Sequence, residues 1–280
     1  MLVFSYLSYP YMIIAFKNFN YKLGVFGSEW CGFKNFEFFL KSTNAPTVIR
    51  NTLVLNLLFI VTGTLTSLVL AILLNELRSR VFVRTAQTMM LFPHYISWVV
   101  VSYILLAIFS NKNGLANQLL NALGMKSVSW YTKADVWPTI LVWMKIWKSA
   151  GMNAVIYLAA ITGIDESIYE SATIDGANRF QRIVSITVPL IMPTVCIMTL
   201  LAVGKIMNGD FGMIYALVGD QGILYETTDV IDTYVYRVLR QTGDPSQSMA
   251  IGLFQSLIGL VMVVGSNWIV KHTFHEGALF

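Results

Sequence analysis

Long apolar stretches separated by polar connections make up most of this chain. A helix needs roughly 20 mostly apolar residues, at about 1.5 Å each, to cross the hydrocarbon core of a bilayer. Backbone groups in lipid must be satisfied internally, which favours helices. The stretches of about this length are residues 52–74, 86–109, 137–161, 188–207 and 249–270. The pattern therefore predicts an all-α, polytopic membrane protein.

A further apolar stretch, residues 1–16, is too short for a full span and lacks the basic start and the small-residue cleavage site of a signal peptide. We interpret it as the outer part of a first helix whose beginning lies upstream of this start or was lost, and we expect six transmembrane helices with the first one incomplete. Residues 1–46 then hold this partial helix and an outer connection. Residues 47–271 form one transmembrane domain, and residues 272–280 form a tail.

Composition and charge narrow the class of protein further. Hydrophobic residues make up 56% of the chain and charged residues 12%, and the net charge of +4 fits a membrane protein with basic loop ends. No basic tract with interleaved aromatic residues is present, so we exclude nucleic-acid binding. Cys31 lies in a polar connection and Cys196 in an apolar stretch, so we expect two isolated thiols. The histidines, His94, His272 and His275, are isolated or terminal, and we expect no fixed metal.

Pro93 lies inside the apolar stretch 86–109. A proline within a helix removes a backbone hydrogen bond and bends the axis, and the carbonyl that it frees must find another partner. We therefore expect a kinked span at this position.

A charged insert, residues 165–189, separates two of the apolar stretches. Asp165 is placed to cap a short helix, and Gly176 can adopt the left-handed conformation with which many helices end. Asn178 can then cap a second helix, and Pro189 fits the first turn of the next span. The insert therefore predicts a helix, a turn and a second helix.

The same insert resembles the EAA loop of ATP-binding-cassette importer permeases. The positions that carry the resemblance or extend it are Glu170, Ser171, Ala172, Gly176, Ala177, Arg179, Ile186 and Pro189. Ser171 stands where the motif has an alanine, and Val188 where a leucine is usual. The resemblance implies that this loop docks into a groove on an ATPase subunit and transmits its closure to the transmembrane helices. The alternative is an ordinary capped helical hairpin between two spans.

Nearly the whole chain looks like the carbohydrate branch of that family, and most like permeases for polysaccharide, aldouronate or alginate-type oligosaccharides. The stretches that carry this likeness include FKNFNYKLGVFGSEWCGFKNF, NTLVLNLL, LAILLNELR, FPHYISWVVV, IWKSAGMNAVIYLAAITGID and DVIDTYVYRVL. The resemblance implies a type I importer transmembrane domain that is not itself an enzyme. It implies a second, homologous permease, a dimer of cytoplasmic ATPases that binds ATP and Mg, and an extracytoplasmic solute-binding protein. The chain itself has no GxxxxGK[ST] nucleotide motif.

The resemblance also places the chain in a bacterial plasma membrane, with the 165–189 loop and the C-terminus in the cytoplasm. Charge alone argues for the opposite orientation, because this topology leaves more lysines and arginines in the outer connections than in the inner ones. The orientation adopted here therefore follows from the resemblance and not from charge.

Polar residues within spans are costly in lipid and are functional candidates. Aromatic and hydrogen-bonding side chains together suit the C–H faces and hydroxyls of a sugar. The candidates for the substrate pathway are Trp143, Trp147, Lys148, Asn153 and Tyr157 in one span, and Asn208, Asp210, Phe211 and Tyr215 beyond the next. The alternative is that the lysines pair with carboxylates or extend to the interface while the aromatic rings pack between helices.

The polar stretch 225–248 predicts an outer connection with a short amphipathic helix at 229–239. We expect Asp229, Asp232 and Arg237 to face water or a docked binding protein.

Three other functions stay open at this point. A secondary transporter or channel works without an ATPase, but it more often has carboxylates deep in its spans for ion coupling, and the spans here have none that is deep. A structural membrane subunit would tolerate substitutions at Trp147, Asn153 and Asp210. A permease of the same family with a non-sugar cargo is the third.

Overall fold

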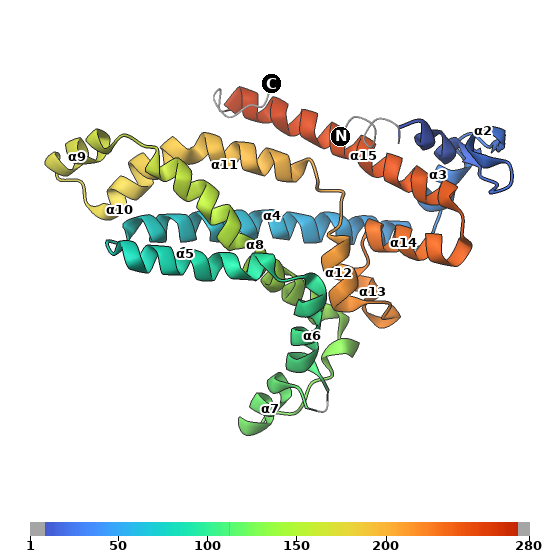
Figure 1. Cartoon of the computed structure of the whole chain (residues 1–280), viewed down its shortest axis with the longest axis horizontal. Coiled ribbons are helices and arrows are strands. Elements are labelled where there is room, and N and C mark those ends of the chain that lie inside the picture. The colour runs from blue at the N-terminus through green and yellow to red at the C-terminus, as the bar shows by residue number, and fades with distance from the viewer. Residues whose placement is uncertain (1–8, 112, 274–280) are drawn as a thin grey trace. The chain divides into compact units, whose positions relative to one another are not determined.

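The computed structural model describes residues 9–111 and 113–273, and this part of the chain is mainly helical (Figure 1). The α-helices are α2 Gly24–Gly27, α3 Lys34–Leu40, α4 Ala45–Glu76, α5 Arg80–Tyr95, α6 Trp98–Phe109, α7 Leu115–Ala122, α8 Trp137–Thr162, α9 Glu166–Ile174, α10 Arg179–Arg182, α11 Val188–Val203, α12 Phe211–Val218, α13 Tyr225–Thr228, α14 Ile231–Thr242 and α15 Pro245–Thr273. Short 3-10 helices lie at η1 Tyr9–Phe16, η2 Trp130–Thr132, η3 Ala134–Val136 and η5 Gly222–Leu224, and η4 Ile183–Thr187 is a π-helix. Strands β1 Lys17–Asn18 and β2 Glu29–Trp30 pair antiparallel.

Within the described residues, three helices are long and apolar enough to cross a membrane: Ala45–Glu76, Arg179–Val203 and Pro245–His272. The bent pair α5 and α6 makes a fourth if it is counted as one span. The predicted span 137–161 is also a helix, α8, but it falls below these in apolar character, since Lys145 and Lys148 lie in its middle. The prediction of an all-helical membrane fold is confirmed, whereas these helices do not establish the count of six.

The predicted span 86–109 contains a sharp bend, because two helices, α5 and α6, meet there at an angle of 95°. The break lies at residues 96–97, three residues after Pro93, whose own position is still helical. Ile96, within the break, has an extended backbone with φ −73° and ψ 131°. The bend that Pro93 predicts is therefore present, and it is a break in the helix three residues after the proline.

The predicted first helix, residues 1–16, falls partly outside the described residues, and Tyr9–Phe16 forms a 3-10 helix. His275 and most of the predicted tail also lie outside them. Cys31 and Cys196 are both free thiols, as predicted.

The chain divides into two compact units, which are described separately. The first comprises the residues up to Asn56 together with Val101–Pro138 and Lys205–Val261. The second comprises Leu57–Val100, Thr139–Gly204 and the residues from Met262 onward.

The core of the second unit joins α4, α8 and α11. Its buried side chains are Ala71, Leu74, Ala154, Tyr157, Leu158, Ile161 and Ile191. Small residues allow close helix contacts there: a Cβ on Gly151 of α8 would collide with the carbonyl of Met90 on α5. Figure 1 shows α9 and α10 at the end of this unit where α4 ends and α5 begins.

The core of the first unit is built from more distant parts of the sequence. Its largest fully buried side chains include Phe39, Leu55, Trp137, Met207, Met213, Leu224, Ile231 and Ile251. The indole of Trp137 donates its N–H to the carbonyl of Trp130 at 3.0 Å, which satisfies its one polar group inside the core.

Candidate functional site

The hairpin of residues 165–189 begins as the sequence predicts. Asp165 is the N-cap of α9 and accepts a hydrogen bond from the backbone N–H of Ser167 at 3.0 Å. That hydrogen bond holds the pKa of the Asp165 carboxyl below its ordinary value. Glu166 adds a second negative charge in the first turn, where the helix dipole favours it.

The turn of the hairpin is a complete Schellman motif. The N–H of Gly176 donates to the carbonyl of Thr173 at 3.1 Å, and the N–H of Ala177 donates to the carbonyl of Ala172 at 2.9 Å. Gly176 has φ +79°, a conformation that side chains rarely adopt, although a Cβ there would meet no atom. The demand for glycine at this turn is therefore conformational and not steric.

The second helix starts with a capping box. Asn178 accepts from the backbone N–H of Gln181 at 2.9 Å, and the Gln181 side chain accepts from the backbone N–H of Asn178 at 2.8 Å. From there α10 continues through the π-turn η4 into α11, and Pro189 lies in the first turn of α11. The predicted helix, turn and helix are present; the π-turn was not predicted.

The predicted loop positions differ in exposure. Glu170, Ser171, Gly176, Arg179 and Pro189 are exposed, and Ala172, Ala177 and Ile186 are half-buried. Next to Gly176 and Ala177, a cavity of about 310 Å³ is lined by Asp175, Gly176, Ala177, Gln181, Ser185 and Ile186.

Two large apolar side chains of the hairpin face away from the rest of the chain. Ile174 is 86% exposed and Phe180 is 74% exposed. The sequence reasoning left both out of the site. The sequence does indicate an exposed apolar side chain at Ile174, because this large apolar residue lies between Thr173 and Asp175 at the end of a polar helix.

Polar side chains tie the hairpin to itself and to α4. Arg182 donates to the hydroxyl of Thr173 at 3.0 Å, and Arg179 lies 3.9 Å from the carboxylate of Glu76, the last residue of α4. Tyr169 and Thr187 share a hydrogen bond of 2.8 Å between their hydroxyls. A cavity of about 350 Å³ lies beside them, lined by Asn75, Glu76, Ile161, Thr162, Ile164, Glu166, Tyr169, Arg182, Ile183 and Thr187.

Of the pathway candidates on α8, Trp143 and Trp147 are exposed and Asn153 is half-buried. Tyr157 belongs to the core of the second unit. Lys148 donates to the carbonyls of Pro93 at 3.2 Å, His94 at 2.7 Å and Ile96, all at the break between α5 and α6. Its ammonium also lies 5.2 Å from the ring centre of Trp98.

The first unit holds the other four candidates, on or beside an unwound segment, residues 205–210. This segment separates α11 from α12. The predicted span 188–207 is therefore too long at its end, since α11 ends at Val203. Asp210 caps α12 by accepting from the N–H of Met213 at 3.1 Å. Asn208 is exposed.

Phe211 and Tyr215 lie one turn apart on α12 with their rings stacked at 5.2 Å. Tyr236 of α14 contacts both rings at 5.0 Å. Arg240 donates to the Tyr215 hydroxyl at 3.3 Å and pairs with Asp220 at 2.9 Å. A hydrogen bond with Tyr236 raises the pKa of Tyr215, and the hydrogen bond to Asp220 raises that of Arg240. Tyr236 and Arg240 were not among the predicted residues.

Side chains from three helices bind the backbone of the unwound segment. Asn56 of α4 donates to the carbonyls of Ile206 at 2.9 Å and Asn208 at 3.1 Å. Gln255 of α15 donates to the carbonyl of Met207 at 2.9 Å and to the carboxylate of Asp232 at 3.2 Å. The N–H of Gly209 donates to the same carboxylate of Asp232, on α14.

These contacts meet a general requirement of broken helices. A backbone without helical hydrogen bonds needs other partners where no water reaches it. Asn56, Asp232 and Gln255 supply those partners here, and a Cβ on Gly209 would collide with the side chain of Val230.

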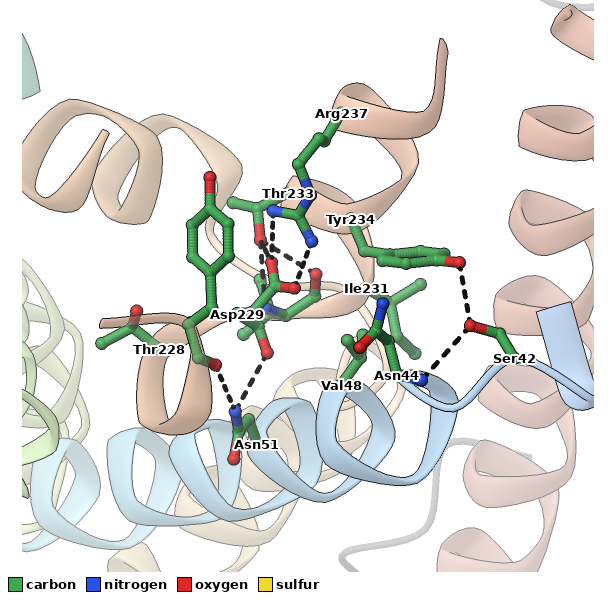
Figure 2. A network of polar contacts seen from close by, with 12 residues as sticks. Ser42, Asn44, Val48, Asn51, Thr228, Asp229, Ile231, Thr233, Tyr234 and Arg237 are labelled. Carbon is green, nitrogen blue, oxygen red and sulfur yellow. Dashed lines mark hydrogen bonds and ion pairs between the residues drawn. The ribbon is translucent and has the colours of Figure 1, made fainter. Parts of the chain in front are cut away.

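The expectation that Asp229, Asp232 and Arg237 face water is wrong. Asp229 is 5% exposed and forms an ion pair with Arg237, and Thr233 donates to the same carboxylate at 2.8 Å (Figure 2). Asp232 is half-buried, and burial raises the pKa of its carboxyl. The charges that looked like a solvated face are internal contacts.

The same network reaches α4. Asn51 donates to the carbonyl of Asp229 at 3.2 Å, and the hydroxyl of Tyr234 lies 3.3 Å from that of Ser42 (Figure 2). Asn51 also donates to the carbonyl of Glu226 at 3.0 Å. The network therefore fixes α13 and the start of α14 against α4.

Comparison with known proteins decides the family. Residues 63–274 match the family described as binding-protein-dependent transport system inner membrane component. The chain belongs to this family. It is a multi-pass membrane protein and a transport permease, as predicted.

Relatives of the permease match it over almost its full length. Protein LplB of Bacillus subtilis (strain 168) is 36% identical over 99% of this chain and 86% of its own length. The polygalacturonan/rhamnogalacturonan transport system permease protein YteP of the same organism is 33% identical over 99% of this chain and 85% of its own length. The crystal structure of a bacterial ABC transporter involved in the import of the acidic polysaccharide alginate contains a chain with a TM-score of 0.89 and 33% identity, covering 98% of this chain and 91% of that one.

Proposed function

We propose that this chain is one permease subunit of an ATP-binding-cassette importer that carries oligosaccharides, and acidic ones in particular, across a bacterial plasma membrane. The observation that carries the proposal is the likeness to the alginate importer over 98% of the chain. YteP, named for polygalacturonan and rhamnogalacturonan, adds a second acidic polymer among the similar permeases.

The complete importer needs parts that this chain does not supply. We place a second, homologous permease beside it, two copies of a cytoplasmic ATPase that bind ATP and Mg, and a solute-binding protein on the outer side. The 165–189 hairpin and the C-terminus then lie in the cytoplasm. The exposed Ile174 and Phe180 suit a docking surface, because apolar side chains buried at an interface stabilise it.

Within the pathway, we propose that Trp143, Trp147 and Asn153 contact sugar and that Lys148 and Tyr157 support the helices behind them. Exposed indole rings offer flat faces for sugar rings, whereas Tyr157 is buried in the core and Lys148 is bound to the carbonyls at the end of α5. Asn208, Asp210, Phe211 and Tyr215 remain candidates for contact with substrate or with the binding protein.

The first test is to purify the tagged chain gently from its native cell and identify what accompanies it by mass spectrometry. We expect an ATPase, a second permease and a solute-binding protein. A chain that purifies alone and still transports sugar would favour a secondary transporter and overturn the proposal.

The second test measures cargo in vesicles that contain the purified complex. We expect ATP-dependent uptake of oligogalacturonides and weaker uptake of neutral oligosaccharides of the same length. Trp147→Ala should lower uptake, and Trp268→Ala, at another exposed tryptophan on α15, is the matched control. Equal uptake of neutral and acidic sugars would overturn the acidic preference.

A further inference from the structure

The hydroxyl groups of Tyr169 and Thr187 join the two arms of the 165–189 hairpin. Tyr169 lies on α9, and Thr187 is the last residue of the π-turn that leads into α11. Their oxygens are 2.8 Å apart, and Thr187 is only 3% exposed. The hydrogen bond is partly buried, so removing one hydroxyl leaves the other without this partner, which costs free energy.

Thr187 also contacts the backbone of the π-turn. Its Oγ1 lies 3.4 Å from the carbonyl oxygen of Arg182, five residues earlier, and can donate to it. Either hydroxyl can be the donor in the 2.8 Å hydrogen bond between Tyr169 and Thr187. A chain of hydrogen bonds thus runs from α9 through Thr187 to the backbone of the π-turn.

A second contact crosses the hairpin on the same face of α9. Thr173, four residues after Tyr169, accepts from Arg182 at 3.0 Å. Tyr169 and Thr173 together attach α9 to the start of the helix that becomes α11. The exposed Ile174 and Phe180 are left out of these contacts.

The π-turn is the irregular part of this connection. π-turns within α-helices are rare and recur at functional sites. Here the turn carries the side chain that α9 binds, and it borders the 350 Å³ cavity together with the ends of α4 and α8. That cavity lies directly beside the hairpin.

We infer that the Tyr169–Thr187 hydrogen bond is the link through which movement of α9 reaches α11. This inference rests on the proposed importer, and it assigns positioning roles to two residues that the EAA motif does not include. Without the bond, α9 still docks through its exposed side chains, but its movement is passed on less completely.

The test compares hydroxyl removals in the whole reconstituted importer. Tyr169→Phe and Thr187→Val each delete one hydroxyl and keep the size of the side chain. We expect uptake per ATP hydrolysed to fall by about 3- to 10-fold, the population shift that the loss of one hydrogen bond produces. The double variant should be no worse than the worse single variant, because both remove the same bond.

Two further variants separate this role from a general loss of structure. Thr187→Ser restores the hydroxyl and should restore the wild-type ratio. Thr162 lines the same cavity, and its hydroxyl donates only to the carbonyl of Ala159 in its own helix. Thr162→Val removes that hydroxyl and should leave the ratio of uptake to ATP hydrolysis unchanged.

The result that overturns the link is a wild-type ratio of uptake to ATP hydrolysis in Tyr169→Phe, or additive losses in the double variant. Uptake by the wild-type importer is measured in the same vesicles. If the wild-type importer shows no uptake, the proposed cargo is refuted and not the link. In that case, the stimulation of ATP hydrolysis by the binding protein is measured instead. We expect this stimulation to fall in Tyr169→Phe, and an unchanged stimulation overturns the link.

Discussion

The 165–189 hairpin and the unwound segment 205–210 both interrupt the long helices, but they are stabilised in different ways. The hairpin satisfies its helix ends with neighbours in sequence: Asp165 with Ser167, Asn178 with Gln181, and Ala177 with Ala172. The unwound segment depends on Asn56 and Gln255, which are far away in sequence.

The difference has a physical meaning for transport. A hairpin with its own caps can move as a piece without losing its shape, since its hydrogen bonds travel with it. A segment held by other helices keeps its shape only while those helices stay in place. Substitutions in the hairpin should therefore alter coupling, and substitutions around the unwound segment should alter stability.

The largest effect is expected where a buried ion pair loses one member. Asp229→Ala leaves Arg237 half-buried without its carboxylate, which typically costs about 3 to 5 kcal/mol. We expect a loss of folded protein, measured by thermal unfolding of the purified chain in detergent. Asp220→Ala breaks the exposed pair with Arg240 and should cost less than about 1 kcal/mol. Equal costs for the two variants would show that burial does not set the strength of these pairs.

The next effect is expected at the turn of the hairpin. Gly176→Val places a β-branched residue at φ +79°, a strain of about 1 to 3 kcal/mol. We expect normal membrane insertion and a loss of about tenfold or more in uptake per ATP. Gly163→Val, at a nearby glycine without a positive φ, is the control. Full transport by the Gly176 variant would count against a coupling role for this turn.

A smaller loss of stability is expected at the unwound segment. Gln255→Leu leaves the carbonyl of Met207 without a donor and removes one hydrogen bond from Asp232, a cost of about 1 to 3 kcal/mol. Unfolding in detergent measures it. Ser256→Ala, next to it on α15 but exposed and bonded only to Gly252 of its own helix, should change stability by less than about 0.5 kcal/mol. If the two variants lose the same stability, the unwound segment does not depend on the distant side chain of Gln255.

The smallest effect on the isolated chain is expected at Phe180. Phe180→Ser should change its stability by less than about 0.5 kcal/mol, because the ring is 74% exposed. The same variant should weaken assembly with the ATPase, which co-purification from the native cell measures. The exposed Leu123→Ser in the first unit is the control. Undiminished recovery of the ATPase with Phe180→Ser would remove this ring from the docking surface.

The hairpin could be predicted from the sequence because its determinants are local. An aspartate, a glycine, an asparagine and a proline at fixed spacings specify caps and a turn whatever lies around them. The π-turn could not be predicted, because residues 183–187 look like an ordinary apolar helix and the partner of Thr187 is eighteen residues earlier.

The segment 225–248, which the sequence predicts as an outer connection, was predicted wrongly in part because its determinants are distant in sequence. Asp229, Asp232 and Arg237 have the spacing of a solvated helix face, and only their contacts show that they are internal. Asn51 likewise gives no sign in sequence that it binds the carbonyls of Glu226 and Asp229.

The sequence by itself determined the membrane class, the family and the local form of the hairpin, because apolar length, motif spacing and capping act over a few turns of chain. The tertiary structure decided where the helices break and which charges are buried. Those outcomes depend on which distant side chains, such as Asn56 and Lys148, supply hydrogen bonds to a backbone that has left the helix. Such partners are chosen by packing, which no short stretch of sequence encodes.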